Sequence, residues 1–295
     1  MIIVNIKGGL GNQMFQYAVG RSLAEKHNTE LKLDRSFLQS QHQASHVTVR
    51  HYELSIFNVR DVFSTPAETA RFKNLGTRLL RKVMPGYGGN PYVKERFFQF
   101  DPEILQLPDN VYLEGHWMTE KYFENVAPVI RREFTFGKPV IEAAKKLEES
   151  IRTSNAVCVQ VRRGDYVTNP AVAKVHGTTT LEYYRRAIDL VKSKIDNPIF
   201  FVFSDDSQWC MKHLNIMEPV HFVEDELKHG NASNSDYFQL MTQCKHFVIS
   251  NSTFAWWGAW LGVHEQKMVV APRRWFNDSH IVTTDIYPKT WLKVE

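Results

Sequence analysis

Two adjacent arginines and a nearby aspartate are the residues in this chain whose types and spacing most clearly suggest chemistry. They lie in the run Gln160-Val161-Arg162-Arg163-Gly164-Asp165-Tyr166, which follows the apolar residues 156–159. Neighbouring guanidinium groups need an anion or a tight ion-pair network, and the planar fork of arginine fits phosphate oxygens. We therefore predict a diphosphate site formed by Arg162 and Arg163. The alternative is an Arg–Asp pair that only stabilises the end of a strand.

A second candidate segment, residues 250–253, follows a buried strand and opens the apolar helix 254–261. A helix N-terminus offers backbone N–H groups and the positive end of the helix dipole to an anion. The hydroxyl groups of Ser252 and Thr253 could also serve only as caps, and the two roles are compatible. This helix is apolar on nearly every face, so we expect its three Trp residues to pack in the core and not to stack on a base.

A pair of carboxylates, Asp205 and Asp206, follows Ser204 at the end of another apolar run. Such a pair could hold Mg²⁺ beside a diphosphate, but the arginines already supply positive charge, so a metal would be redundant. We expect these carboxylates to hydrogen-bond a guanine or a ribose. Capping of the following helix is the alternative.

A glycine-rich turn, residues 7–13, separates the first predicted strand from a helix at about 13–27. This arrangement brings backbone N–H groups and a helix N-terminus to a ligand. Met14 stands where the dinucleotide-binding fingerprint has its third glycine. The turn around Gly9 and Gly11 could therefore also be an ordinary tight connection.

Strands and helices alternate throughout the second half, which predicts a doubly wound parallel sheet. Ligands of such sheets gather at the carboxyl ends of the strands, where the three candidate segments lie. We expect residues 167–180 to form a loop. The other predicted elements are strands at 156–159, 199–203, 220–223, 247–249 and 268–270, and helices at 181–194, 208–214, 234–244 and 253–261.

The first half is predicted to be a similar unit, with strands at 1–6, 30–34 and 111–117 and helices at 13–27, 65–84 and 120–134. Thr65-Pro66-x-Glu68 is typical of a helix start. A polar patch at 39–46 and a Gly/Pro-rich segment at 85–91 make this half the expected acceptor side. Glu114 and His116 alternate to one face, where they could serve a sugar or a proton transfer, or only the structure. An amphipathic helix at 139–152 is expected to link the halves, giving domains 1–150 and 151–295, with a last segment that could return to the first half.

Composition supports a globular protein, because 43% of the 295 residues are apolar and 13% are aromatic. The net charge of +4 suits an anionic small molecule or the face of an anionic membrane but is too weak to indicate nucleic acid. Three widely spaced cysteines lack metal-ligand spacing and suggest a reducing compartment. The chain enters a strand at once and has no apolar run of about 18 residues, so we expect no signal peptide and no membrane span. A cytoplasmic location is expected, including the inner face of the membrane.

These segments together resemble the alpha-1,2-fucosyltransferases of glycosyltransferase family 11, of the bacterial type. The first run that carries the resemblance is Gly8-Gly9-Leu10-Gly11-Asn12-Gln13-Met14-Phe15-Gln16-Tyr17-Ala18. The others are Val161-Arg162-Arg163-Gly164-Asp165-Tyr166-Val167, Phe203-Ser204-Asp205-Asp206 and Asn251-Ser252-Thr253-Phe254-Ala255-Trp256-Trp257-Gly258-Ala259-Trp260. In order and spacing they cover nearly the whole chain.

The resemblance implies an α/β fold of the GT-B type, with two Rossmann-like halves facing a cleft and mostly parallel sheets. It implies GDP-L-fucose as donor and a terminal galactose as acceptor, carried on an oligosaccharide or a lipid-linked glycan. It also implies that Arg162 grips the β-phosphate. Gln160 stands where related enzymes have His and cannot carry a proton near neutral pH.

Further site residues follow from the resemblance. Ser252, Thr253 and Phe254 are implied to lie against the diphosphate, and Gly11, Asn12 and Gln13 to face the reaction centre. With the residues considered above, the predicted binding set is Gly9, Gly11, Gln13, Arg162, Arg163, Ser204, Asp205, Asp206, Asn251, Ser252, Thr253 and Phe254.

The expected reaction is a single displacement with inversion and without a metal ion, in which Arg162 stabilises the departing diphosphate. Asp165 is the first candidate for a base, although it could instead orient the arginines, and Glu114 is the second candidate. Asn12 could orient the acceptor hydroxyl. Rival functions are a fucosyltransferase of other linkage, a protein O-fucosyltransferase and a non-catalytic GDP-sugar-binding protein.

Overall fold

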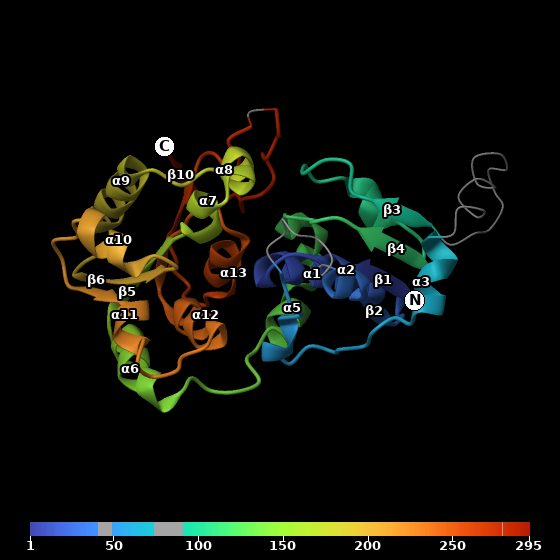
Figure 1. The fold of residues 1–295 in the computed structure, drawn as a ribbon, viewed down its shortest axis with the longest axis horizontal. Coiled ribbons are helices and arrows are strands. Elements are labelled where there is room, and N and C mark those ends of the chain that lie inside the picture. Colours follow the sequence, from blue (N-terminus) through green and yellow to red (C-terminus); the bar gives the residue numbers. More distant parts are fainter. Residues whose placement is uncertain (41–48, 74–90, 279) are drawn as a thin grey trace. The chain divides into compact units, whose positions relative to one another are not determined.

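The computed structural model describes residues 1–40, 49–73, 91–278 and 280–295, which divide into two compact units (Figure 1). Unit 1 comprises Met1–Gly137 and Thr284–Ile286, and unit 2 comprises Lys138–Thr283 and Tyr287–Glu295. The division falls at Gly137, before the expected residue 150. Helix α6 (Lys145–Thr153) belongs to unit 2 because it packs against α12 (Asn234–Gln243) and β5 (Asn155–Val161).

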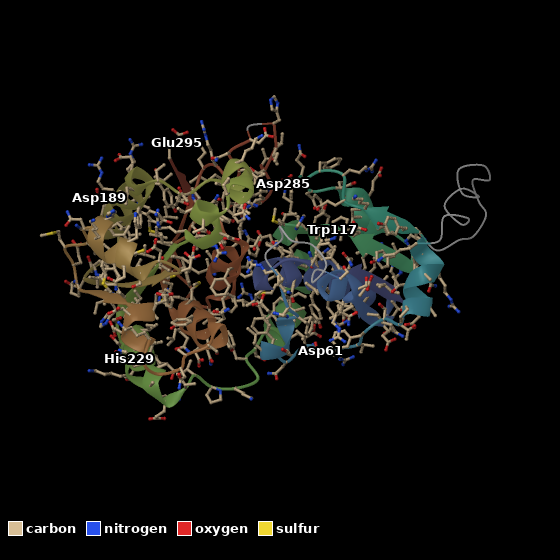
Figure 2. The ribbon with its side chains drawn as sticks, viewed as in Figure 1. Asp61, Trp117, Asp189, His229, Asp285 and Glu295 are labelled. Carbon is tan, nitrogen blue, oxygen red and sulfur yellow. The ribbon has the colours of Figure 1, made fainter. Side chains whose placement is uncertain are left out.

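The late segment 284–286 belongs to unit 1 through specific contacts. Asp285, labelled in Figure 2, accepts a hydrogen bond from the backbone N–H of Phe100 at 3.1 Å and pairs with Lys121. An ion pair and a backbone bond thus hold a stretch from the end of the chain among residues of its first half.

Unit 1 is built on a parallel sheet with the strand order β2-β1-β4-β3. Its strands are β1 (Ile2–Asn5), β2 (Leu31–Asp34), β3 (Tyr92–Lys94) and β4 (Val111–Glu114). Helix α1 (Leu10–His27) packs so closely that a Cβ on Gly20 would lie 2.4 Å from Val4 Cγ2. Its other helical elements are α2 (Ser36–Ser40), η2 (Leu54–Ile56), α3 (Pro66–Lys73), η3 (Pro102–Gln106), η4 (Glu120–Tyr122), η5 (Glu124–Val126) and α5 (Ala127–Glu133).

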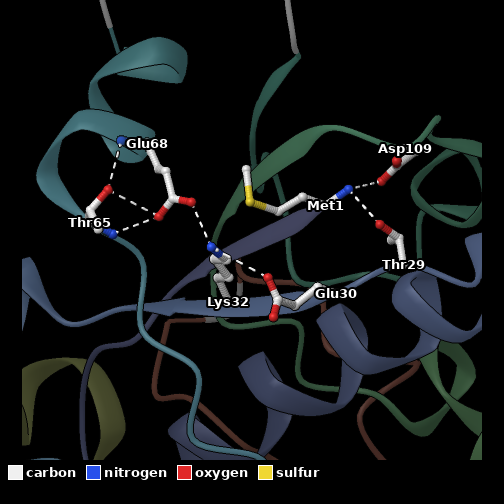
Figure 3. A network of polar contacts seen from close by, with 7 residues as sticks. All are labelled: Met1, Thr29, Glu30, Lys32, Thr65, Glu68 and Asp109. Atoms are coloured by element: carbon white, nitrogen blue, oxygen red, sulfur yellow. Dashed lines mark hydrogen bonds and ion pairs between the residues drawn. The ribbon is translucent and has the colours of Figure 1, made fainter.

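The start of α3 shows the predicted capping arrangement (Figure 3). Glu68 donates its N–H to Thr65 Oγ1 at 3.2 Å, and Thr65 donates its N–H to Glu68 Oε2 at 2.8 Å. Lys32 Nζ lies 2.6 Å from Glu68 Oε1 and ties the helix to β2. The helix start is therefore confirmed, while its predicted continuation over residues 74–84, residues 85–90 of the Gly/Pro-rich segment and most of the polar patch lie outside the described residues.

Unit 2 is a six-stranded parallel sheet with the strand order β10-β9-β8-β5-β6-β7, as predicted for a doubly wound domain. Besides β5 its strands are β6 (Pro198–Ser204), β7 (Val220–Phe222), β8 (His246–Val248), β9 (Val269–Pro272) and β10 (Leu292–Val294). Helices α9 (Leu181–Lys192) and α10 (Ser207–His213) bury apolar side chains against one face. Helices α6, α11 (Val223–Leu227), α12 and α13 (Thr253–Leu261) pack from the other face (Figure 1).

Several predicted elements differ from the structure. Helix α1 begins at Leu10 and not at residue 13, so Gly11, Asn12 and Gln13 of the predicted turn lie in its first turn. Strand β4 ends at Glu114, before the predicted residue 117. The predicted loop 167–180 contains the end of helix α7 (Gly164–Thr168) and the whole of α8 (Pro170–His176). At the start of α8, Asn169 Oδ1 accepts the N–H of Val172 at 3.4 Å, and Pro170 is suited to a first helical turn. The predicted helix 120–134 is two 3₁₀ turns followed by α5, since Phe123 leaves helical geometry. The helix predicted at 139–152 becomes regular only at Lys145, after the 3₁₀ turn η6 (Glu142–Ala144).

Candidate active site

The three predicted segments of unit 2 meet at one edge of its sheet. Strand β5 lies between β6 and β8, with Val161 paired to Ser204 and Val159 to Val248. The chain runs from β5 to β6 on one side and returns to β8 on the other, so the strand order reverses between β5 and β8. Ligands of open α/β sheets bind at such a reversal, outside the carboxyl ends of the strands.

Arg162 leaves β5 at this edge and is held between two carboxylates. Its Nη2 lies 2.6 Å from Asp165 Oδ1, and its Nη1 lies 2.8 Å from Asp205 Oδ2. The guanidinium also lies over the ring of Tyr166, at 5.6 Å from the ring centre. Arginine has five N–H donors, and the side chain is 27% exposed, so a positioned fork remains accessible to an anion.

Arg163 is fixed by helix α10. Its Nε lies 2.9 Å from Asp206 Oδ2, and its guanidinium lies 3.9 Å from the ring centre of Trp209. Asp206 Oδ1 also accepts the N–H of Trp209 at 3.2 Å. Asp206 is therefore the cap of α10, as the alternative interpretation proposed, and Arg163 joins this helix to the end of β5.

Asp205 and Gly164 approach each other closely. Asp205 Oδ1 accepts the backbone N–H of Arg163 at 2.7 Å. A Cβ on Gly164 would lie 2.5 Å from Asp205 Oδ2, so a side chain at this position would displace the carboxylate that holds Arg162. Three carboxylates thus surround the two arginines. The predicted contacts of Ser204, Asp205 and Asp206 with a guanine or ribose stay predictions.

Glu224 is a site neighbour that sequence reasoning missed. Its Oε1 accepts the N–H of Ser204 at 2.8 Å, while its Oε2 is buried without a hydrogen-bond partner among the described residues. Burial, and to a smaller extent the charge of Asp205, raises the pKa of Glu224 to about 8. In the sequence it sits in an acidic run that is typical of a solvated surface, so no local pattern marked it.

The end of β8 is organised by buried polar side chains. Ser250 Oγ donates to Gln160 Oε1 at 2.5 Å, which ties β8 to β5. Asn251 Nδ2 donates to the carbonyls of His176 and Trp275, each at 2.9 Å, and its Oδ1 accepts from Thr179 at 3.2 Å. Asn251 is buried and therefore holds the loops around the start of α13.

The start of α13 leaves its donors available. Ser252 occupies the N-cap position, but its hydroxyl forms no capping bond, so the prediction of side-chain capping by Ser252 is wrong. The first intrahelical bond runs from the N–H of Trp256 to the carbonyl of Ser252 at 2.9 Å. The N–H groups of Thr253, Phe254 and Ala255 therefore lack intrahelical acceptors. The three Trp residues are buried, which confirms their role in the core.

His176 is a second missed neighbour of the arginines. Its ring stacks on Tyr166 at 5.0 Å with an angle of 16° between the planes. Its Nδ1 is buried without a partner in the described part of the chain. Burial, and then the charge of Arg162, lowers the pKa of His176, although Asp165 acts in the opposite direction. The ring therefore supports Tyr166, over whose ring the Arg162 guanidinium lies.

The glycine turn of unit 1 is shaped by Gln13. Gln13 is fully buried, and its Nε2 donates to the carbonyls of Gly8 at 2.9 Å and His51 at 2.7 Å. Its Oε1 accepts the N–H of Glu53 at 2.9 Å. The Gln13 side chain has no exposed surface and is engaged by these bonds within unit 1, and its predicted contact with the ligand stays a prediction. Asn12 lies half-exposed over Gly8, and its predicted contact with the acceptor stays a prediction, as do those of Gly9 and Gly11.

Glu114 and His116 both have partners within unit 1. The Glu114 carboxylate accepts the hydroxyl of Tyr92. The backbone N–H of His116 donates to Glu95 at 2.6 Å, and its ring packs 6.0 Å from that of Phe98. These contacts favour the structural interpretation of the pair.

Three further findings concern the described residues as a whole. Cys158, Cys210 and Cys244 are buried and form no disulfide. Within the described ranges no group of His, Cys, Asp and Glu side chains could hold a metal ion. Nor does any helix there have the length and apolar character needed to cross a bilayer.

Comparison with known proteins identifies the family. The chain matches the family described as "Glycosyl transferase family 11" over residues 1–295. It is 33% identical over 303 residues to the alpha-1,2-colitosyltransferase of Escherichia coli, covering 100% of this chain and 99% of the relative. It is 30% identical over 307 residues to the Escherichia coli O-antigen biosynthesis glycosyltransferase WbnK, covering 98% and 99%. The galactoside alpha-(1,2)-fucosyltransferase 2 of Sus scrofa is 27% identical over 268 residues, covering 88% and 69%.

Solved structures agree with the fold prediction. The fucosyltransferase NodZ from Bradyrhizobium is 13% identical with a TM-score of 0.50, covering 88% of this chain and 93% of that one. FUT1 from Arabidopsis thaliana, solved as a variant in complex with GDP, is 13% identical with a TM-score of 0.51, covering 97% and 74%. The predicted α/β architecture of the GT-B type, with two mostly parallel sheets, is confirmed. With the whole chain matched, this protein is a glycosyltransferase and belongs to glycosyltransferase family 11.

Proposed function

We propose that this enzyme transfers L-fucose from GDP-L-fucose to the 2-hydroxyl of a terminal galactose, with inversion and without a metal ion. The observation that carries the proposal is the strand reversal in unit 2. There, Arg162 and the start of α13 leave the neighbouring strands β5 and β8 at one edge. An arginine fork and a helix N-terminus are a suitable pair of donors for a diphosphate.

The residues of unit 2 would act on the leaving group. The galactose hydroxyl oxygen forms a bond to the anomeric carbon, while the bond from that carbon to the β-phosphate oxygen breaks and GDP departs with the electron pair. Negative charge then grows on the diphosphate, where Arg162 and the N–H groups at the start of α13 stabilise it more than in the ground state. These donors supply the positive charge that a metal would otherwise provide.

The carboxylates around the arginines would keep this site preorganised. Asp165 and Asp205 hold the two ends of the Arg162 fork, so its direction is fixed before the ligand arrives. The ion pair to Arg162 favours the orienting role for Asp165 over the role of a base. The GDP diphosphate would accept hydrogen bonds from the N–H groups of Arg162 that are not bonded to Asp165 or Asp205.

The acceptor is proposed to be a galactose-terminated oligosaccharide or lipid-linked glycan. The names of the relatives support this choice, because they include galactoside fucosyltransferases and an O-antigen biosynthesis glycosyltransferase. An O-antigen precursor at the inner face of the membrane is a suitable substrate for a mildly basic protein that associates at most peripherally.

A second donor is favoured by one specific observation. A relative of 33% identity is named as a colitosyltransferase, and colitose is the 3-deoxy analogue of L-fucose. GDP-colitose would present the same diphosphate to Arg162 and would differ only at the sugar.

The test is a transfer assay with both donors. Purified protein is incubated with GDP-L-fucose or GDP-colitose, with lactose as acceptor and EDTA present, and the product linkage is determined by NMR. An α-1,2-fucosylated product with EDTA present supports the proposal. If transfer occurs from GDP-colitose and not from GDP-L-fucose, the proposed donor is wrong and GDP-colitose takes its place. GDP-sugar binding without turnover would instead indicate a non-catalytic binding protein.

A further inference from the structure

We propose that Glu53 is the base that removes the proton of the acceptor hydroxyl, and that Gly9 is kept small to let the acceptor sugar reach Glu53 and Arg50. This inference rests on the proposed function and assigns acceptor chemistry to the glycine turn of unit 1. The turn follows β1 where the strand order of the unit 1 sheet reverses, between β1 and β4.

Gly9 is a glycine that the backbone does not require. Its neighbour Gly8 has φ +77°, and a Cβ there would lie 2.6 Å from Asn12 Nδ2. Both the backbone conformation and the contact with Asn12 therefore favour glycine at position 8. Gly9 has φ −79° and ψ 178°, which any residue adopts. A Cβ on Gly9 would make only ordinary contacts, 3.7 Å from Arg50 Nη1 and 3.7 Å from Glu53 Oε2. Glycine costs chain entropy on folding, so an unneeded glycine on a half-exposed turn indicates space kept for a ligand.

The groups that border this space are suited to a sugar hydroxyl. Glu53 supplies a carboxylate that can accept a proton, and Arg50 supplies donors for neighbouring hydroxyl oxygens. Both lie within 3.7 Å of the same point above Gly9. The carboxylate is half-buried, so water does not fully surround it.

The segment that carries Glu53 is held rigidly. The buried amide of Gln13 binds the carbonyl of His51 and the N–H of Glu53 and so fixes the backbone on both sides of Tyr52. The same amide binds the carbonyl of Gly8. One side chain thus sets the distance between the glycine turn and Glu53, and Gln13 is a positioning residue for this base.

The electrostatic surroundings are compatible with a base. Burial raises the pKa of Glu53, while Arg50, the N–H of Leu10 and His51 act in the opposite direction. Among the residues that the structure describes, Arg50 and His51 are the charged or titratable groups that face it, and α1 contributes the N–H of Leu10. In the proposed reaction the acceptor hydroxyl gives its proton to the Glu53 carboxylate. At the same time the hydroxyl oxygen bonds to the anomeric carbon and GDP leaves.

The test compares Glu53→Gln and Gly9→Ala with Glu124→Gln, which removes a charge from an exposed position in unit 1. Transfer kinetics, GDP binding by calorimetry and lactose binding by NMR are measured for each. For Glu53→Gln we expect transfer kcat to fall about 10²- to 10⁴-fold, with GDP binding unchanged and the acid limb of the pH profile lost. His51→Gln should retain that limb, which separates the two titrating groups.

Gly9→Ala is an independent test because its methyl group fits the fold. We expect the KM for lactose to rise about 10-fold or more, with the melting temperature and GDP affinity unchanged. Unchanged transfer by Glu53→Gln, reduced transfer with an unchanged pH profile, or unchanged lactose binding by Gly9→Ala would each overturn the inference. If the wild type transfers no sugar, the proposed function fails, and lactose binding by Gly9→Ala still decides whether the space above the turn is an acceptor site.

Discussion

Arg162 shows how one side chain can be both neutralised and available. Its fork is held by Asp165 and Asp205 at its two ends, which fixes its direction, and the side chain keeps part of its surface in solvent. Lysine would preserve the charge but has no fork that could bridge two carboxylates and still bind a phosphate.

For Arg162→Lys we expect kcat/KM for transfer to fall about 10²- to 10³-fold, because a fixed donor to the developing charge is lost. Steady-state kinetics on the purified variant measure this. Arg186→Lys is the control, since Arg186 is exposed on α9 and pairs only with Glu182 among the described residues. An unchanged kcat/KM for Arg162→Lys would remove this residue from the mechanism.

Glu224 gives a prediction for stability against pH. Its pKa is about 8 in the folded protein and 4.5 ordinarily, so the folded state binds more protons between these values. Wild-type stability should therefore decrease as pH rises through this window, by up to about 1.4 kcal/mol per pH unit from this group. Glu224→Gln keeps an acceptor for Ser204 and cannot ionise.

The free energy of unfolding is compared at pH 5 and pH 9 by chemical denaturation. Relative to wild type, Glu224→Gln should gain stability at pH 9 and show little difference at pH 5. The exposed neighbour Glu226→Gln provides the control. Parallel pH dependences of wild type and Glu224→Gln would show that Glu224 is ionised in the folded protein.

Local sequence patterns predicted those elements whose signals are themselves local. The apolar runs before Arg162 and Asp205 predicted strands β5 and β6, and the Thr65–Glu68 pattern predicted the start of α3. Helix α8 was missed although Asn169 and Pro170 mark its start. The three-residue strands β3 and β10 are too short for alternation to show, and only their neighbours in the sheet define them.

The start of α13 is positioned by long-range bonds that converge on Asn251. For Asn251→Ala we expect the free energy of unfolding to fall by about 1–3 kcal/mol, because the carbonyls of His176 and Trp275 lose their donor. GDP affinity should fall with it, since the loops around the helix start loosen. Denaturation and calorimetry measure the two effects. The control is Asn155→Ala, which removes an exposed Asn that donates one hydrogen bond. It should change neither the free energy of unfolding nor the GDP affinity. An equal effect of the two variants would refute the role of Asn251.

Across the whole molecule, alternation of strands and helices predicted both sheets and the edge where the arginines lie. The partners within that edge were not predictable, because Glu224 and His176 reach it from other elements of unit 2. Within unit 1, no local pattern showed that Glu53 lies beside Gly9. Gln13 is an instructive case: its motif was recognised, but its buried contacts with His51 and Glu53 depend on a segment about 40 residues away.

The central claim is that the edge between β5 and β8 binds the diphosphate of the donor. A crystal structure of the protein with GDP, grown in the presence of EDTA, tests this most directly. We predict a β-phosphate oxygen within hydrogen-bond distance of Arg162 and of a backbone N–H at the start of α13. GDP bound elsewhere, or a β-phosphate that contacts neither group while Arg162 remains paired only with Asp165 and Asp205, would contradict the account.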